Sequence, residues 1–224
     1  MDEITERKWK VLNRDTIKYI AMFTMLLNHI STIFMESGKF VSELFLNAGY
    51  FTAIIMCYFL VEGYQYTHSK KKYAFRLIIY ALISEIPYCL AFTKNGVLEF
   101  CGLNMLFTLF ICFCILFVVE RVKNTPLKVV SILILILLSL ASDWPLLAPI
   151  FTLLFIWGKD SKKKLKAAFV ISIILFGMFK FAGGIGRFPL NTNILYALGR
   201  IVGVTLAGIV IIYFYNGKRM ERGK

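Results

Sequence analysis

Eight apolar segments, separated by charged or turn-forming residues, constrain this chain more than any other feature. They lie near residues 15–36, 44–65, 73–93, 102–121, 126–142, 145–158, 165–181 and 194–216. A helix needs about 20 apolar residues to cross the hydrocarbon core of a bilayer, and only helices and closed barrels satisfy the backbone there. We therefore predict an all-α integral membrane protein, a bundle of about eight transmembrane helices.

The fifth and sixth segments are short, and their junction is crowded with Asp143, Pro145 and Pro149. Basic residues precede the fifth segment and follow the sixth. Because basic residues collect on one side of a membrane, this pair of segments forms either two short crossings or a re-entrant hairpin.

Composition excludes a soluble domain. The chain of 224 residues is 58% hydrophobic and 17% charged, whereas soluble domains are roughly 45–50% apolar and about 25% charged. Its 26 Lys and Arg against 13 Asp and Glu fit cytoplasmic loops of a membrane protein rather than binding to nucleic acid.

The distribution of these basic residues predicts the topology. A cytoplasmic N-terminus leaves only Lys39, Lys94, Lys180 and Arg187 outside. The cytoplasmic side then holds the following residues: Arg7, Lys8, Lys10, Arg14, Lys70, Lys71, Lys72, Arg76, Arg121, Lys123, Lys128, Lys159, Lys162, Lys163, Lys164, Lys166, Lys218, Arg219, Arg222 and Lys224. We expect a multi-pass protein of the cytoplasmic (inner) membrane with both termini in the cytoplasm: residues 1–14 as an N-terminal segment, 15–217 as the membrane domain and 218–224 as a basic tail.

Polar residues inside the apolar segments are the candidates for function, since ionisable groups at membrane depth are costly and usually functional. His29 lies about 21 Å along the first segment from Asp15, at 1.5 Å per residue, and follows Asn28. Glu85 lies at a similar depth in the third segment. Together with Asn104 and Asp143, at the outer ends of the fourth and fifth segments, these residues form a predicted outer polar level.

A second polar level is predicted near the cytoplasm. Arg14 and Lys18 are four residues apart, so they share one helix face and can hold a phosphate group if that face lines a pocket. Glu62 and Arg76 lie near the same depth, and we expect Glu62 to form a structural ion pair with Lys18 or Arg76.

Structural interpretations stay open for several of these residues. His29 can serve as a hydrogen-bonding residue between helices, Glu85 can be a paired carboxyl beside Pro87, and Asp143 can cap a helix. In the last segment Gly199, Gly203 and Ala207 indicate close helix packing, and Arg200 beside them is expected to extend to the membrane surface or to form a pair. The five cysteines are expected to be packing residues, and two histidines are too few to suggest a metal site.

The order of the sequence motifs resembles the TraX family of membrane acetyltransferases over residues 12–155. The motifs that carry the resemblance are Asp15-x-x-Lys18-x-Ile20-Ala21-x-x-x-Met25-x-x-Asn28-His29-Ile30, Phe59-Leu-Val-Glu62-Gly63-Tyr64-x-x-Thr67, Lys72-Tyr73-x-x-Arg76-Leu77, Ile83-Ser84-Glu85-Ile86-Pro87-Tyr88, Leu103-Asn104-x-x-Phe107-Thr108-Leu109 and Ser142-Asp143. Where the family pattern usually has an aspartate before the histidine, this chain has Asn28.

The resemblance implies an enzyme that moves an acetyl group from acetyl-CoA to an acceptor amine or hydroxyl, with His29 as the essential histidine of the first span. In this hypothesis His29 acts as general base or acyl carrier, Asn28 or Asn104 donates to the oxyanion, and Glu85 orients the imidazole. The acceptor is an exported peptide, glycan or lipid that Asp143 helps to bind. The coenzyme phosphates are expected at four basic residues: Arg14, Lys18, Lys72 and Arg76.

Other classes of protein remain possible from the sequence. A small transporter or a membrane-embedded substrate-binding subunit would use the two polar levels as a permeation path, although the later segments lack counterparts of Asn28, His29 and Glu85. An intramembrane protease is disfavoured because the chain has no Gly-x-Ser-Gly and no His-Glu-x-x-His motif. A purely structural membrane protein is the third alternative.

Overall fold

The structure, a computed structural model, describes residues 9–93 and 100–220. Within these ranges all regular secondary structure is helical, apart from two isolated β-bridges. Lys94 and the basic residues at positions 7, 8, 222 and 224 lie outside the described residues. The predicted all-α membrane architecture is confirmed.

Eight α-helices, each overlapping one predicted segment, make up the described part of the chain. Their bounds are α2 Arg14–Phe34, α3 Phe40–Tyr66, α4 Lys70–Phe92, α5 Met105–Arg121, α6 Thr125–Leu138, α7 Leu147–Gly158, α8 Lys162–Gly184 and α9 Leu190–Ile209. A five-residue π-helix, Val210–Phe214, extends α9. Five of these helices are long and apolar enough to cross a membrane: α2, α3, α4, α8 and α9 with its extension.

Side-chain caps fix where four of the helices begin. Asn13, Ser69, Asn104 and Asn124 each accept a hydrogen bond from a backbone N–H in the first turn of the helix that follows. Such caps satisfy one of the backbone donors that a helix start leaves open. Short polar residues that cap these helices therefore mark several of the breaks between the predicted apolar segments.

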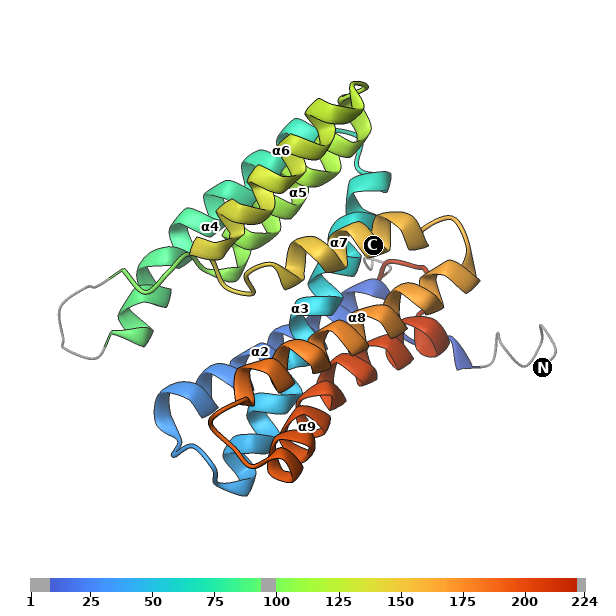
Figure 1. Cartoon of the computed structure of the whole chain (residues 1–224). Coiled ribbons are helices and arrows are strands. Elements are labelled where there is room, and N and C mark those ends of the chain that lie inside the picture. Colours follow the sequence, from blue (N-terminus) through green and yellow to red (C-terminus); the bar gives the residue numbers. More distant parts are fainter. Residues whose placement is uncertain (1–8, 94–99, 221–224) are drawn as a thin grey trace. The chain divides into compact units, whose positions relative to one another are not determined.

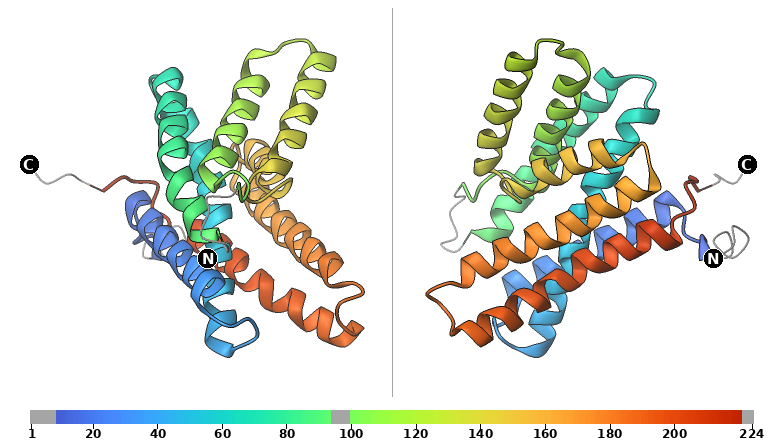
Figure 2. Two further views of the ribbon diagram at one scale, coloured as in Figure 1. Left: turned by 90° about the vertical axis from the view of Figure 1, so that its left-hand side faces the viewer. Right: turned by 45° about the vertical axis from the view of Figure 1, so that its right-hand side comes forward.

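The chain divides into two compact units, of which the first comprises residues 1–55 and 166–224. It contains α2, the first part of α3, most of α8, and α9. Helices α8 and α9 run side by side in both figures (Figures 1 and 2). Gly203 and Ala207 of α9 are buried, and a Cβ atom on Gly203 would lie 2.2 Å from the backbone oxygen of Asn47. The predicted small-residue packing of the last segment is thus present between α9 and α3.

The two ends of the described chain lie together in the first unit. Leu12 and Tyr215 form a parallel β-bridge, and the amide of Arg14 donates to the carbonyl oxygen of Lys218 at 2.9 Å. The amide of Met220 donates to the Asp15 carboxylate at 2.8 Å. This proximity agrees with the predicted even number of membrane crossings, which places both ends on one side, while the side that faces the cytoplasm stays a prediction from charge.

The second unit comprises residues 56–165 and is built around α5. Helix α5 contacts α4, α6 and α7, and it forms a hairpin with α6 (Figure 2). Cys112 and Ile115 of α5 and Phe151 and Phe155 of α7 are almost completely buried. This unit holds the two short helices whose crossing the sequence left open.

Helices α6 and α7 are each too short to cross a bilayer alone. Their 14 and 12 residues extend about 21 Å and 18 Å, against a hydrocarbon core of about 30 Å. Between them Trp144 and Leu146 have positive φ angles of 59° and 62°. Irregular backbone at membrane depth is tolerated only where protein buries it, and Ser139 and Ser142 of this junction are buried. A 3-10 helix, Ser139–Ala141, continues α6, and the choice between two short crossings and a re-entrant hairpin stays a prediction.

The close contact at Gly203 predicts a stability difference between two identical substitutions. Gly203→Ala would push a methyl group against the α3 backbone, so we expect a loss of about 1–3 kcal/mol. Gly183→Ala, on α8, is the matched control, because a Cβ there meets nothing within 4 Å. Thermal unfolding of the detergent-purified variants measures both; equal melting temperatures would contradict the packing described here.

Candidate functional site

The residues predicted to form the catalytic site are divided between the two units. Asn28 and His29 belong to the first unit, and Glu85, Asn104 and Asp143 belong to the second.

Asn28 joins α2 to α3. Its side-chain amide donates to the carbonyl oxygen of Leu46 at 3.0 Å, and a Cβ atom on Gly49 would lie 2.2 Å from the Cβ of Asn28. The two helices approach closely because position 49 carries no side chain. This bond uses one of the two amide N–H groups of Asn28, and its oxyanion role stays a prediction.

His29 lies at the edge of a polar seam between α2 and α3. Thr24 and Ser31 of α2 form hydroxyl contacts with Thr52 (3.0 Å) and Ser42 (2.8 Å) of α3. Positions 24, 28 and 31 share one helical face, so the seam faces α3. His29 is one residue, or about 100°, away from Asn28, and it is half-buried. These hydrogen bonds fix the rotation of α2 against α3, and the position of α2 in turn sets the position of the imidazole.

Arg200 is the buried charge whose arrangement sequence reasoning left undecided. Its guanidinium donates to Asn47 Oδ1 at 3.0 Å and pairs with Glu43 Oε2 at 2.8 Å. The residue is 5% exposed, and its guanidinium carbon lies 4.6 Å from the centroid of the Tyr196 ring. Of the two expectations, pairing is confirmed. The sequence could have suggested this ion pair, because it has one arginine in the last apolar segment and one glutamate beside the start of the second apolar segment.

A second cation adjoins this group. The ammonium of Lys180, on α8, lies 4.7 Å from the centroid of the Tyr50 ring, and Arg200 lies 5.8 Å from the same ring. A cation over an aromatic face is stabilised by the ring's quadrupole. Tyr50 of α3 is thus in contact with cations from α8 and α9, which fixes three helices of the first unit at one place.

In the second unit the structure brings together two predicted residues, Glu85 and Asn104. The carboxylate oxygen Oε2 of Glu85 accepts from the Asn104 backbone amide at 3.0 Å and from its side-chain amide at 2.7 Å. The same side-chain amide also donates to the Ala81 carbonyl oxygen at 2.9 Å and to Ser84 Oγ at 3.2 Å. The Oδ1 atom of Asn104 caps α5 through Leu106.

These bonds already engage both amide hydrogens of Asn104, which is 5% exposed. An oxyanion role for Asn104 would therefore require one of its bonds to break. Glu85 matches the open structural interpretation of a paired carboxyl, since it links α4 to the start of α5. Its predicted pairing with His29 stays a prediction.

Asp143 holds the junction between α6 and α7. Its backbone amide donates to the Leu103 carbonyl oxygen at 2.8 Å, and its carbonyl oxygen accepts from the Thr108 hydroxyl at 2.5 Å. Its carboxylate oxygen Oδ1 accepts from the amide of Trp144 at 3.0 Å. The expected helix cap by Asp143 is wrong, because α7 starts at Leu147 without a side-chain cap and the Asp143 carboxylate bonds within the bend before it; a role for Asp143 in binding the acceptor stays a prediction.

The four residues predicted to bind the coenzyme also fall in different units. Arg14 and Lys18 lie at the start of α2, where Arg14 is buried and Lys18 half-buried. Lys72 and Arg76 are exposed at the start of α4. Each pair is four residues apart and shares a helix face. Glu62 is half-buried on α3 in the second unit, and its ion pair stays a prediction.

Glu120 is a further charged residue that the sequence analysis did not single out. At the end of α5 it accepts a hydrogen bond from the Tyr64 hydroxyl at 2.5 Å and forms an ion pair with Lys70. The Lys70 ammonium lies 4.4 Å from the centroid of the Tyr64 ring. Lys70 of α4 therefore contacts both Tyr64 of α3 and Glu120 of α5.

Comparison with known proteins settles the family. The family model described as TraX protein matches residues 13–224. The chain belongs to the TraX family. The TraX match extends beyond the motifs at 12–155 to include α8 and α9, and so includes Arg200. The chain is also similar, at 27% identity over 219 residues, to "Probable fimbrial assembly protein FimC, serogroup H1" of Dichelobacter nodosus, covering 92% of this chain and 85% of that protein. No solved structure matches.

The Glu85–Asn104 contact predicts unequal effects for two helix-cap substitutions. Asn124→Ala removes an exposed cap of α6 and should cost about 1 kcal/mol. Asn104→Ala removes a cap and also the side-chain amide that donates to the half-buried Glu85 carboxylate, while the backbone donor remains, so we expect about 2–3 kcal/mol. Unfolding of the purified variants measures the difference, and adding Glu85→Ala should cost less than the sum of the single changes. Equal effects of the two cap variants would refute the network.

The Arg200 ion pair predicts a loss of stability on removal of its charge. Arg200→Met leaves Glu43 and Asn47 without their buried partner. Removing one member of a fully buried pair costs on the order of 3–5 kcal/mol, and since the Glu43 side chain is 35% exposed, we expect about 2–3 kcal/mol. Arg187→Met, at an exposed position after α8, is the control and should leave the melting temperature unchanged. The reverse order of the two melting temperatures would be incompatible with a buried pair.

Proposed function

We propose that this TraX family protein is a membrane-embedded acyltransferase. It moves an acetyl (acyl) group from cytoplasmic acetyl-CoA to an amine or hydroxyl of an extracytoplasmic acceptor, such as a peptide N-terminus, a glycan or a lipid. The observation that carries the proposal is a half-buried histidine within an apolar helix, next to a polar seam, in a chain that matches the TraX model almost throughout. The name of the similar fimbrial assembly protein supports an acceptor in surface appendages.

The proposed reaction needs one base and one leaving group. His29 takes the proton of the acceptor N–H or O–H while the acceptor atom attacks the thioester carbonyl. A tetrahedral intermediate forms, its carbon–sulfur bond breaks, and the coenzyme leaves as a thiol after receiving the proton from His29. In the acyl-carrier version His29 itself attacks and then passes the acetyl group to the acceptor. Both versions require the imidazole to enter the reaction neutral.

The other residues have supporting roles in this proposal. Arg14 and Lys18, and Lys72 and Arg76, supply the positive charge that phosphate groups of coenzyme A require. Asn28 keeps one amide N–H beyond its bond to Leu46, and we assign that group to the oxyanion. Glu85 is assigned to orient the imidazole, and Asp143 to receive the acceptor.

The two histidines of the chain offer a matched test. His29→Ala should lower transfer of radiolabelled acetyl from acetyl-CoA by about 10²–10⁴-fold, the usual contribution of a general base. His68→Ala changes an exposed residue between α3 and α4 and should leave transfer unchanged. Membranes carrying each variant are incubated with the labelled coenzyme, and labelled extracytoplasmic material is counted.

The amount of protein in the membrane fraction and its melting temperature control for expression and folding. Wild-type transfer by His29→Ala at normal protein levels would overturn the proposal. Uptake or export of a solute that depends on His29 without any acetyl transfer would favour the transporter class instead.

A further inference from the structure

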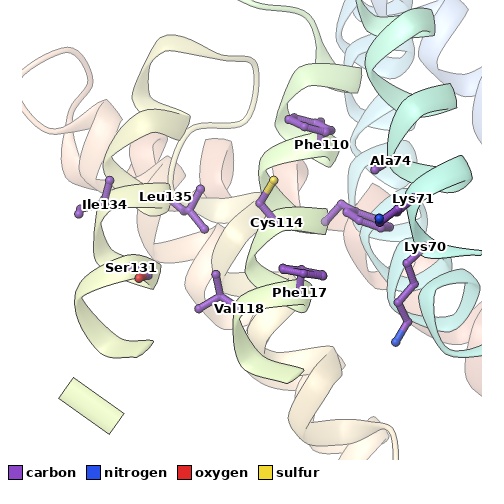
Figure 3. Close-up of a pocket in the computed structure, with 11 residues that line it drawn as sticks. Lys70, Lys71, Ala74, Phe110, Cys114, Phe117, Val118, Ser131, Ile134 and Leu135 are labelled. Atoms are coloured by element: carbon purple, nitrogen blue, oxygen red, sulfur yellow. The ribbon is translucent and has the colours of Figure 1, made fainter. Parts of the chain in front are cut away.

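The second unit contains an apolar groove that the proposed transfer reaction does not use. It lies along α5 between α4 and α6 and has a volume of about 480 Å³, within the range of roughly 300–1,000 Å³ typical of small-molecule sites. Figure 3 shows its walls, with the aromatic side chains of Phe110 and Phe117 on α5 and Ile134 and Leu135 on α6. We call it the α5 groove.

The polar side chains of the α5 groove lie mainly at one end. Lys70 and Lys71, from the first turn of α4, line that end, and Ser131 of α6 adds a hydroxyl. The lining from Phe110 to Val118 runs along α5 for about 12 Å at 1.5 Å per residue. The groove is therefore amphipathic along its length, with cations at the membrane boundary and hydrocarbon-like walls beyond.

The charge balance at this end favours an anion. Lys70 forms an ion pair with Glu120, so the negative charge of the Glu120 carboxylate is neutralised. Lys71 is exposed and lies about 100° around α4 from Lys72, so the Lys72–Arg76 face assigned to the coenzyme is a different one. Among the described residues, Lys71 forms no ion pair. Lys72 follows Lys71 in the sequence, and Arg121 and Lys123 follow Glu120, the ion-pair partner of Lys70.

We propose that the α5 groove binds an anionic phospholipid, with one acyl chain against α5 and the phosphate on the Lys71 ammonium. Basic residues near the membrane boundary attract anionic lipids of the cytoplasmic leaflet, by about 1 kcal/mol per residue. A long-chain acyl-coenzyme A shares this chemistry, but its pantetheine arm carries two amide groups. Beyond the two lysines, Ser131 and the weakly polar Cys114 thiol are the polar side chains that the groove offers, and this favours the lipid.

The test compares lipids that differ only in headgroup charge. Full-length protein is purified in detergent, depleted of lipid, and titrated with phosphatidylglycerol or phosphatidylcholine of identical chains, and bound lipid is counted by native mass spectrometry. We expect the wild type to prefer phosphatidylglycerol. Lys71→Gln should weaken that preference roughly fivefold, the value of one basic residue at a membrane surface.

A second pair of variants tests the apolar part of the site. Cys114→Trp places a large ring in the groove and should abolish binding of both lipids. Cys101→Trp, at an exposed position outside the groove, should leave both unchanged, and Lys163→Gln, at the exposed start of α8, is the charge control. Circular dichroism and size-exclusion profiles verify that each variant is folded.

Three results would overturn the proposal. The first is equal binding of the two lipids by the wild type, and the second is undiminished binding by Cys114→Trp. The third is displacement of phosphatidylglycerol by a long-chain acyl-coenzyme A at lower concentration, which would assign the groove to the coenzyme. Since none of these measurements involves acetyl transfer, their outcome is independent of the function proposed above.

Discussion

The requirement that polar groups find partners inside an apolar molecule governs this structure. A chain that is 58% hydrophobic crosses hydrocarbon on helices, where an unsatisfied polar group costs several kcal/mol. Several polar residues within the helices therefore connect one helix to a neighbour. Thr52 is bonded to Ala21, Asn104 to Glu85 and Arg200 to Glu43. These bonds, more than apolar contact, set the register between helices, because lipid competes equally for apolar surface.

The same requirement explains the form of the α6–α7 segment. Between two helices of 14 and 12 residues lies a junction whose backbone is irregular at Trp144 and Leu146. That backbone is satisfied by the start of α5: Leu103 exchanges hydrogen bonds with Ala141 and Asp143, and the Thr108 hydroxyl donates to Ser142 Oγ and to the Asp143 carbonyl oxygen. Since Asn104 also binds Glu85 of α4, one short stretch at residues 103–108 orders three helices. A binding role for Asp143 would therefore be added to a residue that already has a structural task.

The sequence predicted the helices well because hydropathy and short polar caps are local signals. Each of the eight segments became a helix, and the shortness of the fifth and sixth was correct. The contact between Glu85 and Asn104 was predicted only as a shared depth, since depth follows from residue counting. The rotation of a helix and the partner of each polar side chain cannot be obtained by counting residues. Arg200 lies 153 positions from Asn47 and 157 from Glu43. Glu120 lies 56 positions from Tyr64 and 50 from Lys70. No periodicity in one sequence encodes such pairings.

The distribution of these partners bears on which residues remain available for chemistry. Asn104 has no amide hydrogen to spare, and the Glu85 oxygen Oε2 accepts two bonds. Arg200 and Lys180 are held against Tyr50 and Tyr196. Asn28, by contrast, makes one side-chain bond, to the Leu46 carbonyl oxygen, and His29 is the next residue along α2. A half-buried histidine in an apolar helix, next to an asparagine that keeps one amide N–H, offers the base and the hydrogen-bond donor that the proposed acyl transfer needs, and the proposed chemistry therefore centres on His29.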